Sequence, residues 1–267
     1  MTKLQRIVIL IAVGLFLLLY FGVNTPFFGL STKSNEQRQL EKTRSLQAES
    51  TDISVLLKNA KSALSSAQSG RIFLLEQSLA ETQEDSARIE QLQQLSGTWF
   101  DLGHPAIAGY YAQEIAEIAG TAESWSIAGT TYTICLQQAT EEKVREYCSG
   151  RAVSALENAI SLDPDQLAHQ VNLSLVYTEN PSPDDPMRGI LMLRELNEAH
   201  PNNVLVMNTL ARLAIKTGQF DRAIERLERS LELDADNQVT VCLLAAAYQG
   251  AGNENKAAEF AARCNAQ

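Results

Sequence analysis

The sequence repeats itself near its C-terminal end with a spacing of 34 residues. Residues 204–237 carry apolar and small residues at set distances from a glycine, and the same residue types recur 34 positions later. The matching pairs are Leu210 and Leu244, Ala211 and Ala245, Gly218 and Gly252, Ala223 and Ala257, Leu227 and Ala261, and Ser230 and Cys264. Such a period is typical of proteins that stack one supersecondary unit on the next, so it constrains the fold more than any other feature of the chain.

The repeated pattern resembles the tetratricopeptide repeat, which is a helical hairpin of about 34 residues. Leu210 and Ala211 correspond to the Leu-Gly pair of its first helix, Gly218 lies in the turn, and Ala223 and Leu227 lie along the second helix. The resemblance implies an all-α protein, a TPR-type α-solenoid of antiparallel helix hairpins. The alternative, an ordinary helical bundle, would not repeat glycine, alanine and proline at this spacing.

Three segments further upstream match the same pattern in part. The matching residues are Leu92, Leu95, Ser96, Trp99, Gly103 and Ala108 in the first, Trp125, Ala128, Gly129, Tyr132, Ala152, Leu156, Ala159 and Pro164 in the second, and Leu173, Ser174, Tyr177, Gly189, Leu193, Leu196 and Pro201 in the third. The second segment has 11 extra residues between Tyr132 and Ala152, which predicts lengthened helices or a larger turn. In the third, the sequence NPSPDDP enlarges the turn. The resemblance therefore covers about five units: 89-120, 122-164, 167-201, 204-237 and 238-267.

Small residues within the repeats mark the expected contacts between helices. Gly129, Ala152, Ala211, Ala223 and Ala245 would let neighbouring helices approach closely, while larger side chains fill the remaining space. A single hairpin is too small to bury its own apolar face, so the units must stack. Residues 51–88 continue the helical pattern before the repeats, from Asp52 as a possible cap through Ile53 to Leu64, and again after Gly70. We expect these N-terminal helices to pack on the solenoid.

A transmembrane signal anchor is predicted at residues 7–23. This run, IVILIAVGLFLLLYFGV, contains no charged residue and as a helix would extend about 26 Å, at the short end of the range that spans a bilayer. The alternatives are a buried core helix, which would normally carry a polar stripe, and a cleaved signal peptide, which would need a cleavage site that residues 24–33 do not show. Residues 1–6 would then be a short cytoplasmic tail, and residues 24–50 a polar linker.

The orientation of this anchor follows from the basic residues beside it. Lys3 and Arg6 precede the run, and Lys33, Arg38 and Lys42 follow it, so the two counts are close. Arg6 abuts the run, whereas the nine residues after Val23 carry no charge. We therefore expect a single-pass protein of the bacterial inner membrane, with the C-terminal domain in the periplasm.

The four cysteines fall into two pairs that a helical hairpin would bring to matching heights. Cys135 and Cys148 flank the expected turn near residues 139–142, and Cys242 and Cys264 flank Gly252. Each pair could form a disulfide that holds one hairpin together in an oxidising compartment. In the alternative interpretation all four are packed free thiols.

Composition and motifs argue against several classes of function. The chain has 32 acidic and 22 basic residues, a net charge of −10, so no basic surface for nucleic acid is expected. His104, His169 and His200 do not stand beside a nucleophile or a carboxylate pattern, and Asp85, Asp184 and Asp185 are expected in solvated turns. We expect that the protein is not an enzyme, and we expect no cofactor, no metal and no small-molecule substrate.

The remaining functional feature is the concave surface that the family resemblance implies, formed by the first helices of the hairpins, which in this family binds peptides or proteins. The candidate residues are Asn172, Leu175, Asn208, Arg212, Lys216 and Gln249. Asn208, Arg212 and Lys216 would share one stripe of a helix, which could hold a peptide backbone or a carboxylate, or could be ordinary solvated polarity. A cytosolic clamp for acidic C-termini is less favoured, because the second unit has Ser126, Thr130 and Thr133 at the equivalent positions.

These observations favour a membrane-anchored TPR scaffold that faces the periplasm and assists assembly of an envelope protein complex. One alternative is a cytosol-facing receptor with reduced thiols. Another is an enzyme that uses the long hairpin or the NPSPDDP loop.

Overall fold

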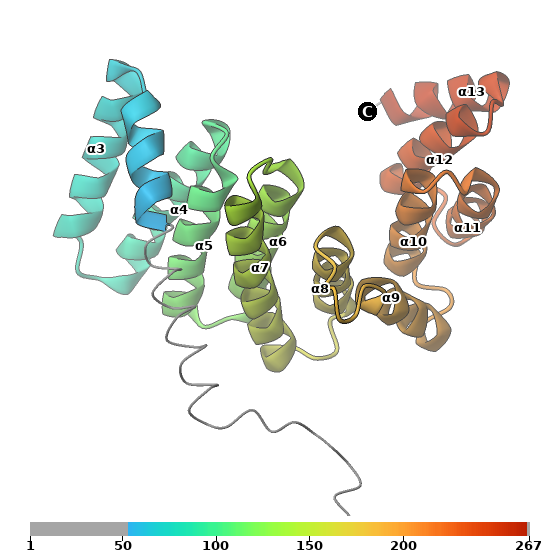
Figure 1. Ribbon diagram of the computed structural model, residues 1–267, viewed down its shortest axis with the longest axis horizontal. Coiled ribbons are helices and arrows are strands. Elements are labelled where there is room, and N and C mark those ends of the chain that lie inside the picture. Colours follow the sequence, from blue (N-terminus) through green and yellow to red (C-terminus); the bar gives the residue numbers. More distant parts are fainter. Residues whose placement is uncertain (1–52, 266–267) are drawn as a thin grey trace, which may run out of the picture. The chain divides into compact units, whose positions relative to one another are not determined.

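The computed structural model describes residues 53–265, which belong to one compact unit of the chain. Their regular structure is helical, apart from an isolated bridge between Ser182 and Asp185. A helix covers residues 53–63. It is followed by α3 (Ser66–Glu81), α4 (Asp85–Asp101), α5 (Pro105–Ala119), α6 (Ala122–Gln138), α7 (Glu142–Leu162), α8 (Leu167–Glu179), α9 (Arg188–Ala199), α10 (Val204–Lys216), α11 (Phe220–Leu233), α12 (Gln238–Gly250) and α13 (Glu254–Asn265) (Figure 1).

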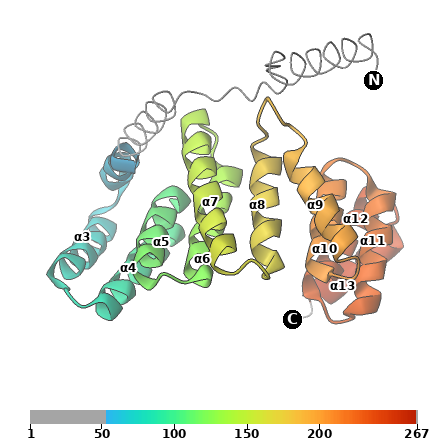
Figure 2. The ribbon, with the colours of Figure 1, turned by 90° about the horizontal axis from the view of Figure 1, so that it is seen from below.

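The helices from α4 onward form successive hairpins. The partners are α4 with α5, α6 with α7, α8 with α9, α10 with α11, and α12 with α13, and the hairpins follow one another in a row (Figure 2). The all-α repeat fold predicted from the sequence is therefore present. The first hairpin begins at Asp85, four residues before the expected unit 89-120. The later hairpins begin at residues 122, 167, 204 and 238, where the expected units begin.

Three hairpin turns share one backbone geometry. Gly103, Gly218 and Gly252 have φ values of 79°, 72° and 76°, in the left-handed region that favours glycine. In each turn the residue after the glycine donates to a carbonyl five residues back, as Gln219 N does to Ala214 O at 2.8 Å, and the glycine N–H donates three residues back. This is the Schellman motif, which ends the first helix and redirects the chain.

Side-chain caps fix several helix starts. Asn203 Oδ1 accepts from Val206 N at 3.1 Å, and Asn237 Oδ1, one period later, accepts from Thr240 N at 3.0 Å. Ser65 and Gln68 form a capping box that begins α3. Helix α3 therefore begins at Ser66 and runs through Gly70, whereas the sequence pattern suggested a break at that glycine.

Glycines inside the helices mark the closest helix contacts. A Cβ atom on Gly129 would lie 2.5 Å from Leu156 Cγ, so the close approach of α6 and α7 requires the missing side chain. At Gly189 a Cβ would lie 2.4 Å from the backbone oxygen of Ser174. The small residues Ala152, Ala211 and Ala223 are fully buried, as the packing interpretation predicted.

The two irregular hairpins differ in where the extra residues lie. In the second hairpin the extra residues lengthen the helices: α6 has 17 residues and α7 has 21, while residues 139–141 alone connect them. In the third hairpin the extra residues stay in the connection, at residues 180–187 between α8 and α9. For the second hairpin, the sequence left open whether the helices or the turn would be longer, and the structure shows longer helices.

Apolar clusters run along the row of hairpins. The first contains Ile53, Ala60 and Ile72 from the N-terminal helices together with Leu92 and Trp99, so residues 53–81 pack on the first hairpin. A second cluster joins α8 and α9 to α10, and a third joins α10 to α13.

The expected tail 1-6, anchor 7-23 and linker 24-50 lie outside the described residues, as do Asp52 and the first residue of the segment 51-88. Within residues 53–265, no helix combines the length and apolar character needed to cross a membrane.

Candidate functional site

A cavity of about 390 Å³ lies at the start of helices α10 and α12. It is lined by Asn203, Val204, Leu205, Asn208, Thr209, Arg212, Asn237 and Val239. These residues come from the first helices of two successive hairpins, which is the surface that the family resemblance implies for partner binding.

Two exposed apolar side chains distinguish this cavity. Leu205 is 43% exposed and Val239 is 49% exposed, and the two residues lie 34 positions apart at equivalent places in successive units. Both are near a helix start, where an apolar side chain would normally be covered by the next unit. Exposed apolar groups at a cavity are typical of binding sites.

Arg212 provides the positive charge of the cavity. It is exposed and lines the cavity, and no ion-pair partner is present among residues 53–265. An exposed guanidinium of this kind can bind a carboxylate through two parallel hydrogen bonds. The cavity thus combines apolar contact with one anion-binding group.

The prediction that Asn208 is a peptide-binding member of a polar stripe is wrong. It is only 3% exposed, and its Nδ2 donates to Thr240 Oγ1 at 2.9 Å while its Oδ1 accepts from Ser230 Oγ at 2.9 Å. These bonds join α10 to α11 and α12. Because its amide is occupied inside the fold, Asn208 forms the base of the cavity and is not a free group for a peptide.

The other four candidate binding residues lie outside the α10–α12 cavity. Lys216 pairs with Glu179 on α8 at 2.7 Å, so its charge is compensated within the fold. Leu175 is half-buried in the cluster that joins α8 to α10. Asn172 is half-buried, Gln249 is exposed, and neither lines the cavity with Arg212. The structure therefore brings together Asn208 and Arg212, but not the full set of six.

Sequence reasoning missed Leu205, Thr209 and Val239. The signal for Leu205 and Val239 was available, because both are apolar residues at the same position of two aligned units. It could not be used, since an apolar residue in the first turn of a helix is normally assigned to the core.

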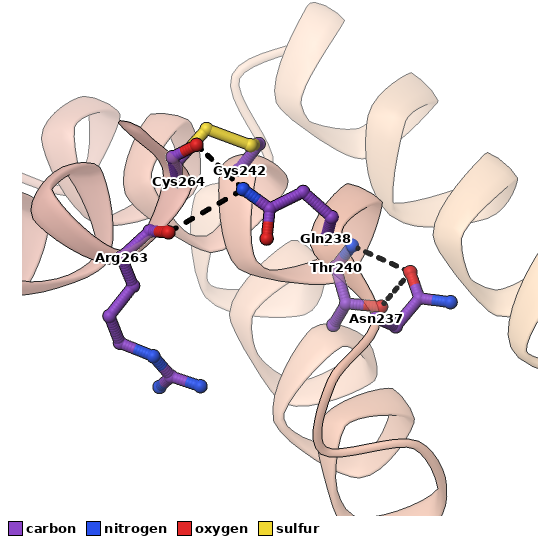
Figure 3. The surroundings of a disulfide bond; sticks show 6 residues. All are labelled: Asn237, Gln238, Thr240, Cys242, Arg263 and Cys264. Atoms are coloured by element: carbon purple, nitrogen blue, oxygen red, sulfur yellow. Dashed lines mark hydrogen bonds between the residues drawn. A yellow bond between two sulfur atoms is a disulfide. The ribbon is translucent and has the colours of Figure 1, made fainter. Parts of the chain in front are cut away.

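Both cysteine pairs are joined as disulfides. Cys135 on α6 bonds Cys148 on α7, with Cα atoms 6.0 Å apart, and Cys242 on α12 bonds Cys264 on α13, with Cα atoms 5.0 Å apart. Figure 3 shows the second bond beside Gln238, whose Nε2 donates to Cys264 O at 2.6 Å. The last hairpin is therefore fastened by a covalent bond and by a side chain that caps the end of α13.

Two of the three histidines serve the fold. His169 is 5% exposed, and its Nδ1 lies 3.1 Å from Ser126 Oγ across α8 and α6. His104 precedes α5 and packs edge-on against Trp99, and burial lowers the pKa of its imidazole. Residues 53–265 contain no group of three or more histidine, cysteine or acidic side chains placed to hold a metal ion.

Comparison with known proteins gives a family match in the same part of the chain. Residues 184–239, which include α9 to α11, match the family model for the tetratricopeptide repeat. A search of curated proteins finds no match.

Comparison with solved structures gives matches at low sequence identity. TTC0263, a thermophilic TPR protein of Thermus thermophilus, is 18% identical with a TM-score of 0.47, over 74% of this chain and 98% of that chain. A crystal structure of MamA is 15% identical with a TM-score of 0.38, over 66% and 89%. MamA from Desulfovibrio magneticus RS-1 is 16% identical with a TM-score of 0.39, over 66% and 92%.

Proposed function

We propose that this tetratricopeptide-repeat protein is a membrane-anchored scaffold that binds a segment of a partner protein at the α10–α12 cavity. The observation that carries the proposal is the pair Leu205 and Val239, exposed one repeat apart beside the uncompensated charge of Arg212. Such a surface would hold one apolar side chain of an extended segment and one carboxylate.

The disulfides support a location outside the cytoplasm. Disulfides persist in oxidising compartments such as the bacterial periplasm and are rare in the cytosol. Together with the apolar run at residues 7–23, they favour a single-pass protein of the inner membrane whose repeats face the periplasm and assist assembly of an envelope protein complex. A cytosol-facing receptor would require all four thiols to be reduced.

The partner site is tested by photocrosslinking in intact cells. A photoreactive residue in place of Leu205 or Val239 should capture a protein partner, whereas the same residue in place of Leu162, which is 53% exposed on α7, should not. Arg212→Glu should reduce capture and leave helicity unchanged. Arg222→Glu is the matched control, because Arg222 is exposed on the second helix of the same hairpin. Equal capture by all variants would remove the cavity from consideration.

The location is tested separately by thiol chemistry. In membranes from cells, the four cysteines should resist alkylation until a reductant is added, and the protein should stay in the membrane fraction after a carbonate wash. Four cysteines that alkylate without reduction would favour the cytosol-facing receptor. Release by carbonate would contradict the anchor while leaving the partner site open to test.

A further inference from the structure

A second cavity lies where the two irregular hairpins meet. It has a volume of about 440 Å³ and is lined by Glu142, Glu146, Ser149, Tyr177, Asn180, Pro181, Ser182, Pro183, Asp185 and Arg188. One side is the start of the lengthened helix α7, and the other is the end of α8 with the enlarged connection 180–187. None of these residues lines the α10–α12 cavity.

Two arginines hold the connection in place. Arg145 on α7 donates to Leu136 O and to Glu179 O, each at 2.9 Å, and so ties the end of α8 to the end of α6. At the other end of the connection, the guanidinium carbon of Arg188 lies 3.9 Å from the centre of the Tyr177 ring. The bridge between Ser182 and Asp185 closes the tip. The cavity is therefore formed in advance of any ligand.

The acidic groups of the cavity lack partners. Glu142 and Glu146 lie one helical turn apart on α7, and Asp185 faces the same cavity from the connection. No side-chain hydrogen bond or ion pair joins these three carboxylates to any residue in the range 53–265, although Glu179 nearby is paired with Lys216. Against three negative charges the lining has one positive charge, that of Arg188, which is already stacked on Tyr177.

A serine that lines the same cavity gives independent support for a ligand. Ser149 lies one further turn along the same face of α7 and is only 8% exposed. Its hydroxyl has no hydrogen-bond partner in the described part of the chain, whereas the other buried helical serine in this region, Ser174, donates to Val171 O at 2.6 Å. Ser149 Oγ is not one of the fully buried polar atoms of the described residues, so it is accessible from the cavity, where a ligand can form a hydrogen bond with it.

The arrangement suits an organic cation better than a metal ion. Within residues 53–265, no three acidic or histidine side chains are close enough together to hold a metal. The carboxylates are spread around a volume that suits an alkyl chain with a charged end. Pro181 and Pro183 provide the apolar wall for such a chain.

We propose that this cavity binds an organic cation, an alkylammonium or alkylguanidinium group, with Glu142, Glu146 and Asp185 as its counter-ions and Ser149 as a hydrogen-bond acceptor. The same chemistry occurs in free polyamines and in the lysine or arginine side chain of a protein. The site is separate from the α10–α12 cavity and does not depend on the function proposed for it.

The test is a calorimetric titration of the full chain in nanodiscs. The probes are spermidine, as a free polyamine, and the peptide acetyl-Gly-Arg-Gly-amide, as a side chain. Saturable binding of either probe, weakened by added salt, is expected. Glu142→Gln and Glu146→Gln should each weaken binding by up to about fivefold, and the double variant should weaken it by more. Ser149→Ala should weaken binding while the unfolding midpoint stays the same.

A matched control and three outcomes make the test decisive. Asp184→Asn removes one charge from the same connection at a residue that does not line the cavity, and it should bind as the original protein does. Preference for spermidine or for the peptide would identify the source of the cation. Absence of saturable binding, or equal binding by the double variant and the original protein, would overturn the proposal. Calcium binding that the double variant also loses would overturn it too, in favour of a metal site.

Discussion

Glycine residues set the distance between neighbouring helices in this protein. Gly189 is buried at the start of α9, and a Cβ atom there would lie 2.4 Å from Ser174 O and 2.7 Å from Thr178 N. Both atoms belong to the backbone of α8, which cannot turn aside as a side chain can. Gly189→Ala should therefore lower the free energy of unfolding by about 1–3 kcal/mol, which urea denaturation would measure.

Gly97 provides the matched control for this substitution. It lies inside α4, is exposed, and a Cβ atom added there would have no neighbouring atom within 4 Å. Gly97→Ala should stabilise the protein by about 1 kcal/mol, because alanine has the higher helix propensity. A stabilising effect of both substitutions would contradict the close contact at Gly189.

Asn208 illustrates how a buried amide can be mistaken for a binding residue. Its bonds to Thr240 and Ser230 predict that Asn208→Ala lowers the free energy of unfolding by about 1–3 kcal/mol, since buried polar partners are left unsatisfied. Asn172→Ala should have little effect, because Asn172 is half-buried and makes no side-chain hydrogen bond within residues 53–265. Equal stability of the two variants, measured by urea denaturation, would contradict the structural role.

His104 should make stability depend on pH. Burial lowers the pKa of its imidazole below the ordinary value of 6.5, so the folded protein binds this proton less readily than the unfolded chain. The neutral ring contributes stability above that value, and the contribution is lost as the pH falls through the lowered pKa. Between about pH 7.5 and pH 5, the free energy of unfolding should fall more in the original protein than in His104→Gln. An equal pH dependence of the free energy of unfolding in the two proteins would contradict this role of His104.

At the scale of single residues, the sequence predicted positions in the repeat better than roles in binding. Ala211, Leu227 and Ser230 are buried where the family pattern places them. The role of Asn208 could not be predicted, because Ser230 and Thr240 reach it from two other helices. Helical periodicity describes one helix at a time and does not report such contacts.

At the scale of the helices, the sequence predicted the hairpins well, because the 34-residue period fixes both helices and the turn between them. It could not decide how α6 and α7 use their extra residues, since either a longer helix or a longer turn fits the same spacing. It also placed the start of α3 too late, because Gly70 suggested a break, whereas the capping box at Ser65 starts the helix earlier.

The last hairpin should depend on its disulfide. The bond between Cys242 and Cys264 closes a loop with a sequence separation of 22, which should contribute about 3 kcal/mol to stability. The double substitution Cys242→Ser and Cys264→Ser should raise amide hydrogen exchange in α13 and in the second half of α12. Exchange in α4 and α5 should stay unchanged, because these helices belong to a different apolar cluster. Equal amide exchange of α13 in the original protein and in the double variant would contradict this local role.

At the scale of the whole described region, the division of the core into clusters predicts unfolding in more than one step. Stacked repeats contact only their neighbours, so cooperativity can fail between clusters. Both tryptophans of the chain, Trp99 and Trp125, lie in the first two hairpins, so their fluorescence reports only on that part. Circular dichroism reports on all helices. In urea, the transitions followed by circular dichroism and by fluorescence should differ in midpoint, and coincident transitions would contradict the prediction.

The enlarged connection between α8 and α9 has a consequence for engineering. The other hairpin turns are short, and three of them require glycine in a left-handed conformation. Added residues would disturb the backbone geometry of these turns. Residues 181–186 carry no such requirement, and Arg145 and Arg188 fix the chain on either side of them. A foreign recognition sequence grafted at this point would be displayed from a rigid base, and the array would accept new specificity without repacking any of its helices.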